Sequence, residues 1–554
     1  MFWPTRCFDL LVGSDPLVVD VTEVTSWRER AELAERRAER AEERLAAAEA
    51  RIEELVEQVA VLSRMLFGRS SEKVSVGAGD LRGSDASGGQ GRTDGEVGRP
   101  RRGQRPGGAG HGRRDYSHLP CREEVHDVPP GQRVCPDCGT AFTALGSEGG
   151  EQIDWQVRLT RVVHRRMRYR RSCACPGPRT VTAPPVPAPI PKGRFTAAFL
   201  ARLLHQKFVL GLPVHRIVKA LAADGLAVPE GTLAGTLKAL AGLLVPLETT
   251  IRARNAAATH VHADETTWRV YEQAEDKTGH RWWLWVFIAE DTIVFRMDAT
   301  RSNSVLDTHF GIDAADRDAG ALPDGRRLVL PSDFYVAYQS LARLDGVDAL
   351  WCWAHIRRRF IRAGDAHPYL VPWRDAWGAR IADLYVAHKA MAAAEPGSGQ
   401  HAAARTAFEQ ALTVIDTVRR QQATGPALHP AAAKVLATLD REWDGLARHR
   451  DFPDTALDNN ISERMLRTPV VGRKNYHGSH AEWSAHLAAR VWTITATAER
   501  HGIEPLTYLT DYLTAFSQAG GKPPEGQALD RFLPWLPGPT GSQDHDPPTI
   551  NPSG

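Results

Sequence analysis

The chain has no long apolar run, no large excess of charge and few cysteines. No apolar stretch reaches the roughly 18 residues that a membrane-spanning helix needs, so we expect a cytoplasmic protein without a membrane partner. The formal net charge of its 554 residues is only +2, which makes the local distribution of charge more informative than the total. Seven cysteines without a secretory signal indicate a reducing compartment, where paired cysteines favour a metal ion over a disulfide.

A heptad pattern runs from Ala31 to Leu66. Its a and d positions are apolar. Three e positions carry glutamate (Glu35, Glu42 and Glu49), and three g positions carry arginine (Arg37, Arg44 and Arg51). Because g of one helix meets e of the next heptad on its partner, the pattern predicts a parallel coiled coil and a homodimer or higher oligomer. The seam is rich in alanine, so a lone solvated helix is the alternative.

Residues 74–119 are rich in Gly, Arg and Ser and show no periodicity, which predicts a disordered basic linker. Within it, Arg99, Arg101 and Arg102 alternate with Pro and Gly. Such an extended arm can enter a minor groove and neutralise DNA phosphates. A linker that only improves solubility has the same composition.

Two cysteine pairs follow, Cys135 with Cys138 in CPDCG, and Cys173 with Cys175. Four thiolates in two short clusters suit tetrahedral Zn²⁺. Only one residue separates Cys173 from Cys175, so this pair would hold its two sulfur atoms more tightly than is usual. Cys121 or His126 is therefore an alternative ligand, and free buried thiols are the other interpretation.

Beyond the proline-rich stretch 183–191, apolar residues recur at helical spacing, with breaks at 211–213 and 224–225. Helix, turn and helix in this order resemble a helix-turn-helix DNA reader. A plain helical hairpin fits equally well, since few basic residues face outward from the last helix.

The period then changes to that of strands. Three β-rich runs, a helix at 302–310, the strand RLVLPSD, a helix from Tyr335 and a strand at 347–351 give the order βββαβαβ. This order fits an RNase H-like mixed sheet, in which Asp264 lies on the first strand and Asp333 ends the neighbouring fourth. Glu463 comes from a later helix that Asp458 can cap, after a helical insertion.

Three carboxylates in one cleft suit two Mg²⁺ ions, or Mn²⁺, and hence the cutting and joining of phosphodiesters. Each acid alone is a weak signal, because Asp at a strand end is usually a cap or turn residue, and Glu265 and Asp458 compete for the assignment. The basic residues after Glu463 are predicted DNA contacts: Arg467, Arg473 and Lys474. Cys352 and His355 of CWAH are either packed structural residues or metal ligands.

Ordered motifs add a family resemblance. They are MLFGRSSEK (65–73), CPDCG (135–139), HADETTW (262–268), PSDFYVAY (331–338), CWAHIRRRF (352–360), DNNISERMLR (458–467), GRKNYHGS (472–479) and LDRFLPW (529–535). With these motifs the chain resembles the large DDE-type transposases of the insertion-sequence-66 family. The resemblance implies Asp264, Asp333 and Glu463 as the catalytic triad. It also implies terminal inverted repeats and target DNA as partners, action at the nucleoid and two possible small accessory proteins. Cys173-Ala-Cys175 departs from the family's usual CxxC spacing.

The prediction is a multidomain α+β protein. Its parts are an unassigned extension (1–25), a coiled coil (26–73), the linker (74–119), a zinc knuckle (120–182), a helix-turn-helix-like block (183–250), an RNase H-like core (255–371 and 456–515), a helical insertion (372–455) and a tail (516–554). The predicted function is DNA transposition. A non-catalytic zinc-dependent DNA-binding remnant and an RNase H-like nuclease without strand transfer are the alternatives.

Overall fold

The computed structural model describes residues 159–170, 172, 180–272, 279–424 and 428–537, with short pieces between 129 and 143. The chain divides into two units, 71–157 and the remainder, and each is described by itself. Among the described residues, no helix is long and apolar enough to cross a membrane. The predicted coiled coil and the linker arginines Arg99, Arg101 and Arg102 lie outside the described residues.

Of the four predicted zinc ligands, only Cys138 lies within the described residues. The Cys138 thiol donates a hydrogen bond to Thr140 Oγ1 at 3.3 Å, whereas Cys135, Cys173 and Cys175 lie outside the described residues. The zinc site therefore stays a prediction.

Part of the basic stretch before the second cysteine pair forms a strand. β1 (Arg168–Arg170) pairs antiparallel with β2 (Thr180–Thr182), and the residues of β1 are exposed. Two such short strands have little to bury between them, so this ribbon gains little stability from its own packing.

A helical block precedes the main sheet. Its elements are α2 (Ala197–Leu204), the π-helix η2 (His205–Val209), α3 (Val214–Ala223), α4 (Glu230–Leu240) and α5 (Val245–Ala256). The predicted break is present, since Gly211 has a positive φ of 66° and Pro213 is the N-cap of α3. Glycine reaches that φ without steric cost, and proline fixes the extended approach to a helix.

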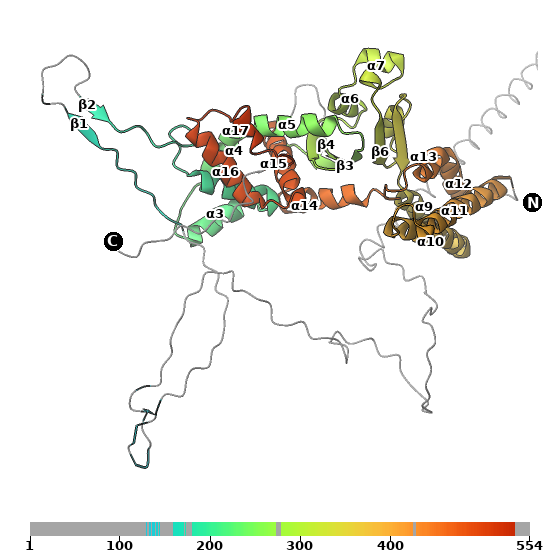
Figure 1. Ribbon diagram of the computed structural model, residues 1–554, viewed down its shortest axis with the longest axis horizontal. Coiled ribbons are helices and arrows are strands. Elements are labelled where there is room, and N and C mark those ends of the chain that lie inside the picture. The colour runs from blue at the N-terminus through green and yellow to red at the C-terminus, as the bar shows by residue number, and fades with distance from the viewer. Residues whose placement is uncertain are drawn as a thin grey trace, which may run out of the picture. The chain divides into compact units, whose positions relative to one another are not determined.

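Five strands form the sheet region (Figure 1). They are β3 (His262–Arg269), β4 (Arg281–Ile288), β5 (Ile293–Asp298), β6 (Leu328–Ser332) and β7 (Val347–Trp351). β3, β4 and β5 pair antiparallel in that order, and β6 pairs parallel with β7. Backbone bonds from Val261 N to Val329 O (3.0 Å) and from Val329 N to Thr259 O (2.7 Å) join the start of β3 to β6. The strand order is thus β5-β4-β3-β6-β7.

The segments between the strands follow the predicted order, with α7 (Ala314–Ala319) and η3 (Pro323–Gly325) as additions. The predicted ones are α6 (Ser304–Phe310) and α8 (Val336–Leu341). The sequence prediction omitted α7, which has six residues and no buried side chain. A capping box between Asp313 and Asp316 begins it, so local hydrogen bonds form this helix where no apolar periodicity marks it.

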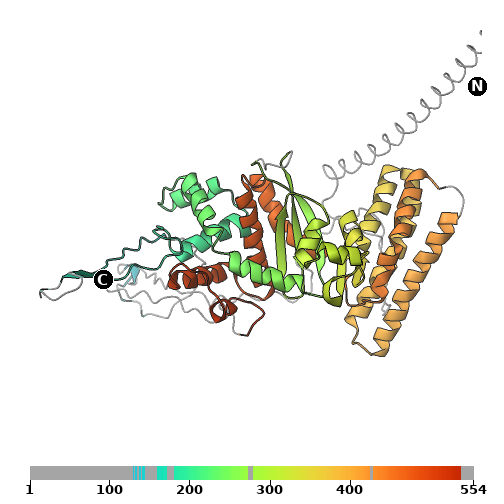
Figure 2. The same ribbon diagram turned by 90° about the horizontal axis from the view of Figure 1, so that it is seen from above.

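The helices that directly follow β7 pack mainly on one another (Figure 2), and the last two of them also contact β7. They are α9 (Trp353–Ala366), η4 (Pro368–Leu370), α10 (Val371–Ala393), α11 (Gly399–Thr424), α12 (Pro430–Arg441), α13 (Trp443–Ala447) and η5 (Arg448–Arg450). The chain then continues through α14 (Asn460–Tyr476), α15 (Glu482–Arg500), α16 (Pro505–Gln518) and α17 (Gln527–Asp530). α14 begins beside the α9–α13 helices and runs toward α15 (Figure 1).

Threonines of α15 cover the outer edge of β5. Thr493 Oγ1 accepts the N–H of Phe295 at 2.8 Å and donates to the carbonyl of the same residue. Thr497 Oγ1 does the same for Ile293. Four helical residues rise about 6 Å and two strand residues about 6.8 Å, so the two spacings match. The helix thereby satisfies an edge that otherwise would present unpaired backbone groups.

Replacing Thr493 and Thr497 with valine should lower the free energy of unfolding by roughly 1–3 kcal/mol per site, because each change leaves a buried N–H and carbonyl unpaired. Thr495→Val is the matched control, since the buried Thr495 hydroxyl bonds only to carbonyls of its own helix. Urea unfolding of the three variants measures the difference. Equal losses at Thr495 and Thr493 would contradict the role of the edge bonds.

Candidate active site

Neighbouring strands carry the two predicted aspartates. Asp264 is the third residue of β3, and Asp333 follows the last residue of β6. Each carboxylate accepts a backbone hydrogen bond, Asp264 Oδ1 from Glu265 N at 2.8 Å and Asp333 Oδ1 from Tyr335 N at 2.9 Å. These bonds fix one oxygen of each group and leave the other for a ligand.

Glu463 approaches from the first turn of α14. Its Oε1 lies 3.3 Å from Nη2 of Arg358 on α9, in an ion pair in which both side chains are partly exposed. A carboxylate near a helix N-terminus is also favoured by the helix dipole. The position of Glu463 is therefore set both by the first turn of α14 and by Arg358 on α9.

Asp264 lies where negative charge accumulates. Burial raises its pKa well above the ordinary value, and the carboxylates of Glu265 and Asp333 raise it further, with a contribution from Glu463. Asp333 and Glu463 thus both lie near enough to Asp264 to act on its charge. A buried carboxylate surrounded by others favours either protonation or a bound cation.

His355 of α9 lies in the same neighbourhood. Burial lowers its pKa, although the carboxylates of Asp333 and Glu463 act in the opposite direction. Its ring packs edge-on against Phe334 at 6.2 Å, and its buried Nδ1 has no hydrogen-bond partner. The CWAH histidine therefore borders the acidic cluster.

Glu265, the first competing acid, is hydrogen-bonded by another set of residues, although burial and Asp333 raise its pKa. Its side chain is only 1% exposed and accepts hydrogen bonds from Arg301 Nε at 2.8 Å and Nη2 at 2.5 Å. The Tyr338 hydroxyl donates to its other oxygen. Arg301 in turn lies over the Tyr335 ring at 3.5 Å. Since all its oxygens are occupied by protein donors, Glu265 is a poorer candidate ligand than Asp264.

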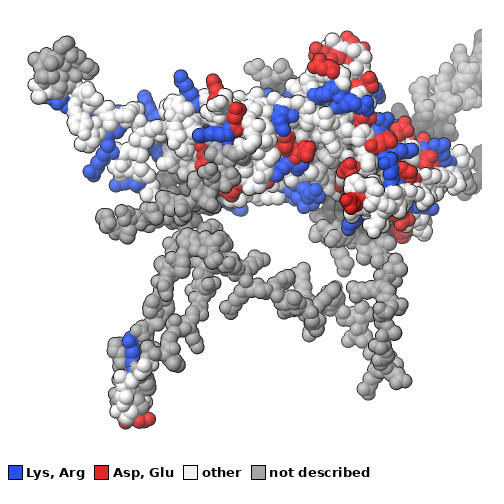
Figure 3. Space-filling model, viewed as in Figure 1, with Lys and Arg blue, Asp and Glu red and all other residues white. Residues whose placement is uncertain are grey.

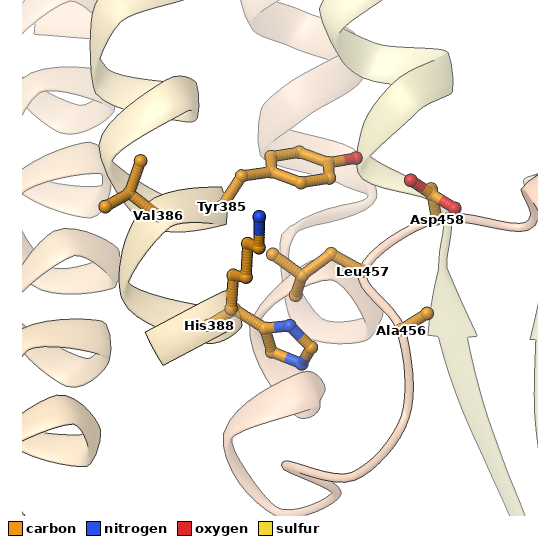
Figure 4. Close-up of a pocket in the computed structure, with 7 residues that line it drawn as sticks. Tyr385, Val386, His388, Ala456, Leu457 and Asp458 are labelled. Carbon is orange, nitrogen blue, oxygen red and sulfur yellow. The ribbon is translucent and has the colours of Figure 1, made fainter. Parts of the chain in front are cut away.

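Asp458, the second competitor, lines a pocket against α10. Tyr385 and His388 border the same pocket (Figure 4). Burial, followed by the Asp458 carboxylate, raises the pKa of Tyr385. Asp458 Oδ1 also accepts the N–H of Asn460 at 3.2 Å, so it does help to cap α14, while Asn459 is the N-cap residue.

The predicted DNA-contacting residues of α14 differ in their surroundings. Arg467 and Lys474 are exposed. Arg473 instead donates to Thr266 Oγ1 at 3.2 Å and to the carbonyl of Thr267, and burial lowers its pKa. It ties α14 to β3, a contact that the sequence pattern did not predict.

Residues that the sequence analysis did not assign include Arg301 and Tyr338, which pair with Glu265, and Asn459, which bonds to β3. Tyr338 and Asn459 lie inside recognised motifs, PSDFYVAY and DNNISER, but motif membership gives no contact partner. Arg301 lies in no motif. Only the folded chain brings it to Glu265.

The oxygen atoms of the three carboxylates are of the kind that Mg²⁺ prefers, but the side chains do not form a closed set of ligands. Within the described part of the chain, no three His, Cys, Asp or Glu side chains already converge as a set of metal ligands. Mg²⁺ keeps several waters and needs only one or two protein carboxylates, so a closed cage is not required. The crowded charge around Asp264 is the observation that fits a cation.

Comparison with known proteins gives a consistent picture. The family described as "Transposase IS66 family" matches residues 192–487, more than half of the chain. Similar proteins of Sinorhizobium fredii include the uncharacterised protein y4qI, 27% identical over 516 residues, which cover 88% of this chain and 89% of that protein. The uncharacterised protein y4jD is 24% identical over 505 residues, covering 87% and 94%.

Arg301→Met should lower the free energy of unfolding by roughly 2–4 kcal/mol, because it leaves the buried Glu265 carboxylate without its cation. Adding Glu265→Gln should recover part of this loss, since a neutral amide needs no counter-ion. Urea unfolding of the single and double variants measures the coupling. Additive losses in this cycle would show that the pair does not interact.

Proposed function

Because the chain belongs to the IS66 family of transposases, we propose that it binds the ends of a mobile DNA element and catalyses Mg²⁺-dependent cleavage and strand transfer. The observation that carries this proposal is that Asp264 and Asp333 lie at neighbouring strands. Burial and the carboxylates of Glu265, Asp333 and Glu463 all raise the pKa of Asp264 there. The strand order β5-β4-β3-β6-β7 supports an RNase H-like core. In that core, the first and fourth strands lie side by side and carry the two aspartates.

Asp264, Asp333 and Glu463 would hold the metal, two Mg²⁺ ions or Mn²⁺. Bound there, the metal would activate the attacking oxygen and stabilise the leaving oxygen of an in-line displacement. The protein's part is orientation. Backbone N–H groups fix one oxygen of each aspartate, and Arg358 holds Glu463 at the edge of the cluster.

DNA would approach over basic surface on this chain. Arg467 and Lys474 are exposed on the helix that carries Glu463. The ribbon arm, residues 159–170 with β2, is a second candidate surface, because no Asp or Glu occurs between Asp154 and Asp224. Lys and Arg are visible on one face of the described structure, including this arm (Figure 3). A two-stranded ribbon is also narrow enough for a major groove.

Other parts of the proposal concern residues that, apart from Cys138, lie outside the described ones. Zn²⁺ bound by Cys135, Cys138, Cys173 and Cys175 would stiffen the region that carries the ribbon arm. Pairing through the heptads would supply a second copy, as two element ends require two sites. Small accessory proteins are further possible partners.

Asp333→Asn should abolish Mg²⁺-dependent cleavage of a duplex that carries the flanking terminal repeat, while binding of that duplex persists. Removing one carboxylate weakens the hold on the metal without changing the basic surface. Glu463→Gln should behave alike, and Asp458→Asn should keep cleavage. Cleavage by purified Asp333→Asn protein would contradict the assignment of Asp333 as a metal ligand. A joining assay with pre-cut ends then separates a transposase from a nuclease without strand transfer.

The double variant Arg168→Gln, Arg170→Gln should weaken DNA binding and reduce the slope of log affinity against log salt by about 0.9 for each phosphate that the variant no longer neutralises. Arg405→Gln is the control, since exposed Arg405 on α11 pairs with Glu409. Titration of a labelled duplex at several salt concentrations provides the slopes. An unchanged slope in the double variant would remove the ribbon arm from the interface.

A further inference from the structure

We infer that Asn459 is a positioning residue that sets the spacing of Asp264, Asp333 and Glu463. The inference rests on the proposed function, because it concerns the same site. Asn459 is 2% exposed and stands one residue before α14 begins. Every polar group it possesses has a partner, and those partners lead to all three carboxylates.

The side chain of Asn459 bonds to β3. Its Nδ2 donates to the carbonyl of Ala263, the residue before Asp264, at 2.8 Å. Its Oδ1 lies 3.1 Å from His262 Nδ1 and accepts from Ser462 Oγ at 2.9 Å. Since Nδ2 must face the Ala263 carbonyl, Oδ1 is the acceptor, and His262 carries its proton on Nδ1.

The backbone of Asn459 reaches the other two acids. Its carbonyl accepts the N–H of Glu463 at 3.4 Å, in the first turn of α14. Its N–H donates to Cys352 Sγ at 3.2 Å. Cys352 in turn donates its own N–H to the carbonyl of Ser332, the residue before Asp333, at 3.0 Å.

Through these bonds, Asn459 connects three segments that are distant in the sequence. Ala263, Ser332 and Glu463 come from β3, β6 and α14, and the first two immediately precede the aspartates. Rigid hydrogen-bonded supports of this kind keep functional groups within a few tenths of an ångström of their working geometry. Asparagine suits the position because it donates and accepts at once. Aspartate would face the Ala263 carbonyl with an oxygen and add charge to an acidic cluster.

A purely structural role is the alternative, and the chain contains a matched control. Asn255 is also fully buried. Its Nδ2 donates to the carbonyl of Thr292 at 3.1 Å, and its Oδ1 lies 2.9 Å from His309 Nε2. It joins α5 to the β4–β5 region as Asn459 joins α14 to β3, but none of its bonded partners adjoins a carboxylate of the cluster.

The test compares Asn459→Ala with Asn255→Ala in the full chain. Thermal unfolding reports the structural loss, and titration of the proteins with Mn²⁺, followed by calorimetry or by the electron paramagnetic resonance of the free ion, reports metal affinity. Both variants should unfold at lower temperature. Only Asn459→Ala should bind Mn²⁺ at least tenfold more weakly. Cys352→Ala, a milder change in the same chain of bonds, serves if Asn459→Ala does not fold, and it should weaken Mn²⁺ binding too.

The outcomes are distinguishable. Equal Mn²⁺ affinity in wild type, Asn459→Ala and Cys352→Ala overturns the positioning role and leaves the proposed function intact. An equal loss of affinity in Asn255→Ala assigns the effect to general destabilisation and also overturns it. A wild-type protein that binds no Mn²⁺, or that binds it equally well as Asp264→Asn, overturns the proposed metal site and the inference together.

Discussion

Crowding of carboxylates around Asp264 is the constraint on which the rest of the site depends. Burial and neighbouring negative charge both oppose ionisation of Asp264. A chain can accommodate such a group by protonating it, pairing it or binding a cation. Here the backbone supplies one hydrogen bond to Asp264 and one to Asp333, and the described residues place no arginine directly on either. Under the proposed function, this charge is what a metal ion would bind.

The acid next to Asp264 is paired with protein donors, although its charge still acts on Asp264. Glu265 is the residue next to Asp264 on the same strand, so its side chain points to the opposite face of the pleat. There Arg301 and Tyr338 occupy its oxygens, and Arg301 itself lies over Tyr335, whose N–H bonds Asp333. Among the described residues, one strand therefore carries Asp264, which has no arginine partner, next to Glu265, which is hydrogen-bonded to Arg301. The same aromatic and arginine contacts also steady the loop that carries Asp333.

Much of the fold was predictable because it follows from local patterns. Alternating residues marked β3, β-rich apolar runs marked β4 and β5, and proline and glycine marked the breaks in the helical block. The short polar helix α7 was missed because its stability comes from a capping box and not from an apolar face. The coiled coil, the linker and most of the zinc ligands lie outside the described residues and stay predictions. At the site, residue type and position on strand or helix indicated the three acids, but their catalytic role is still a proposal.

The sequence by itself determined which segments carry the acids, because strand and helix periodicities depend on neighbours along the chain. It also carried the motifs that identify the family. Only the tertiary structure decided which acid is paired and which is not. The partners of Glu265 are 36 and 73 residues away, and Asn459 bonds to Ala263 across 196 residues. Such contacts depend on how strands and helices pack, and no spacing in the sequence encodes them.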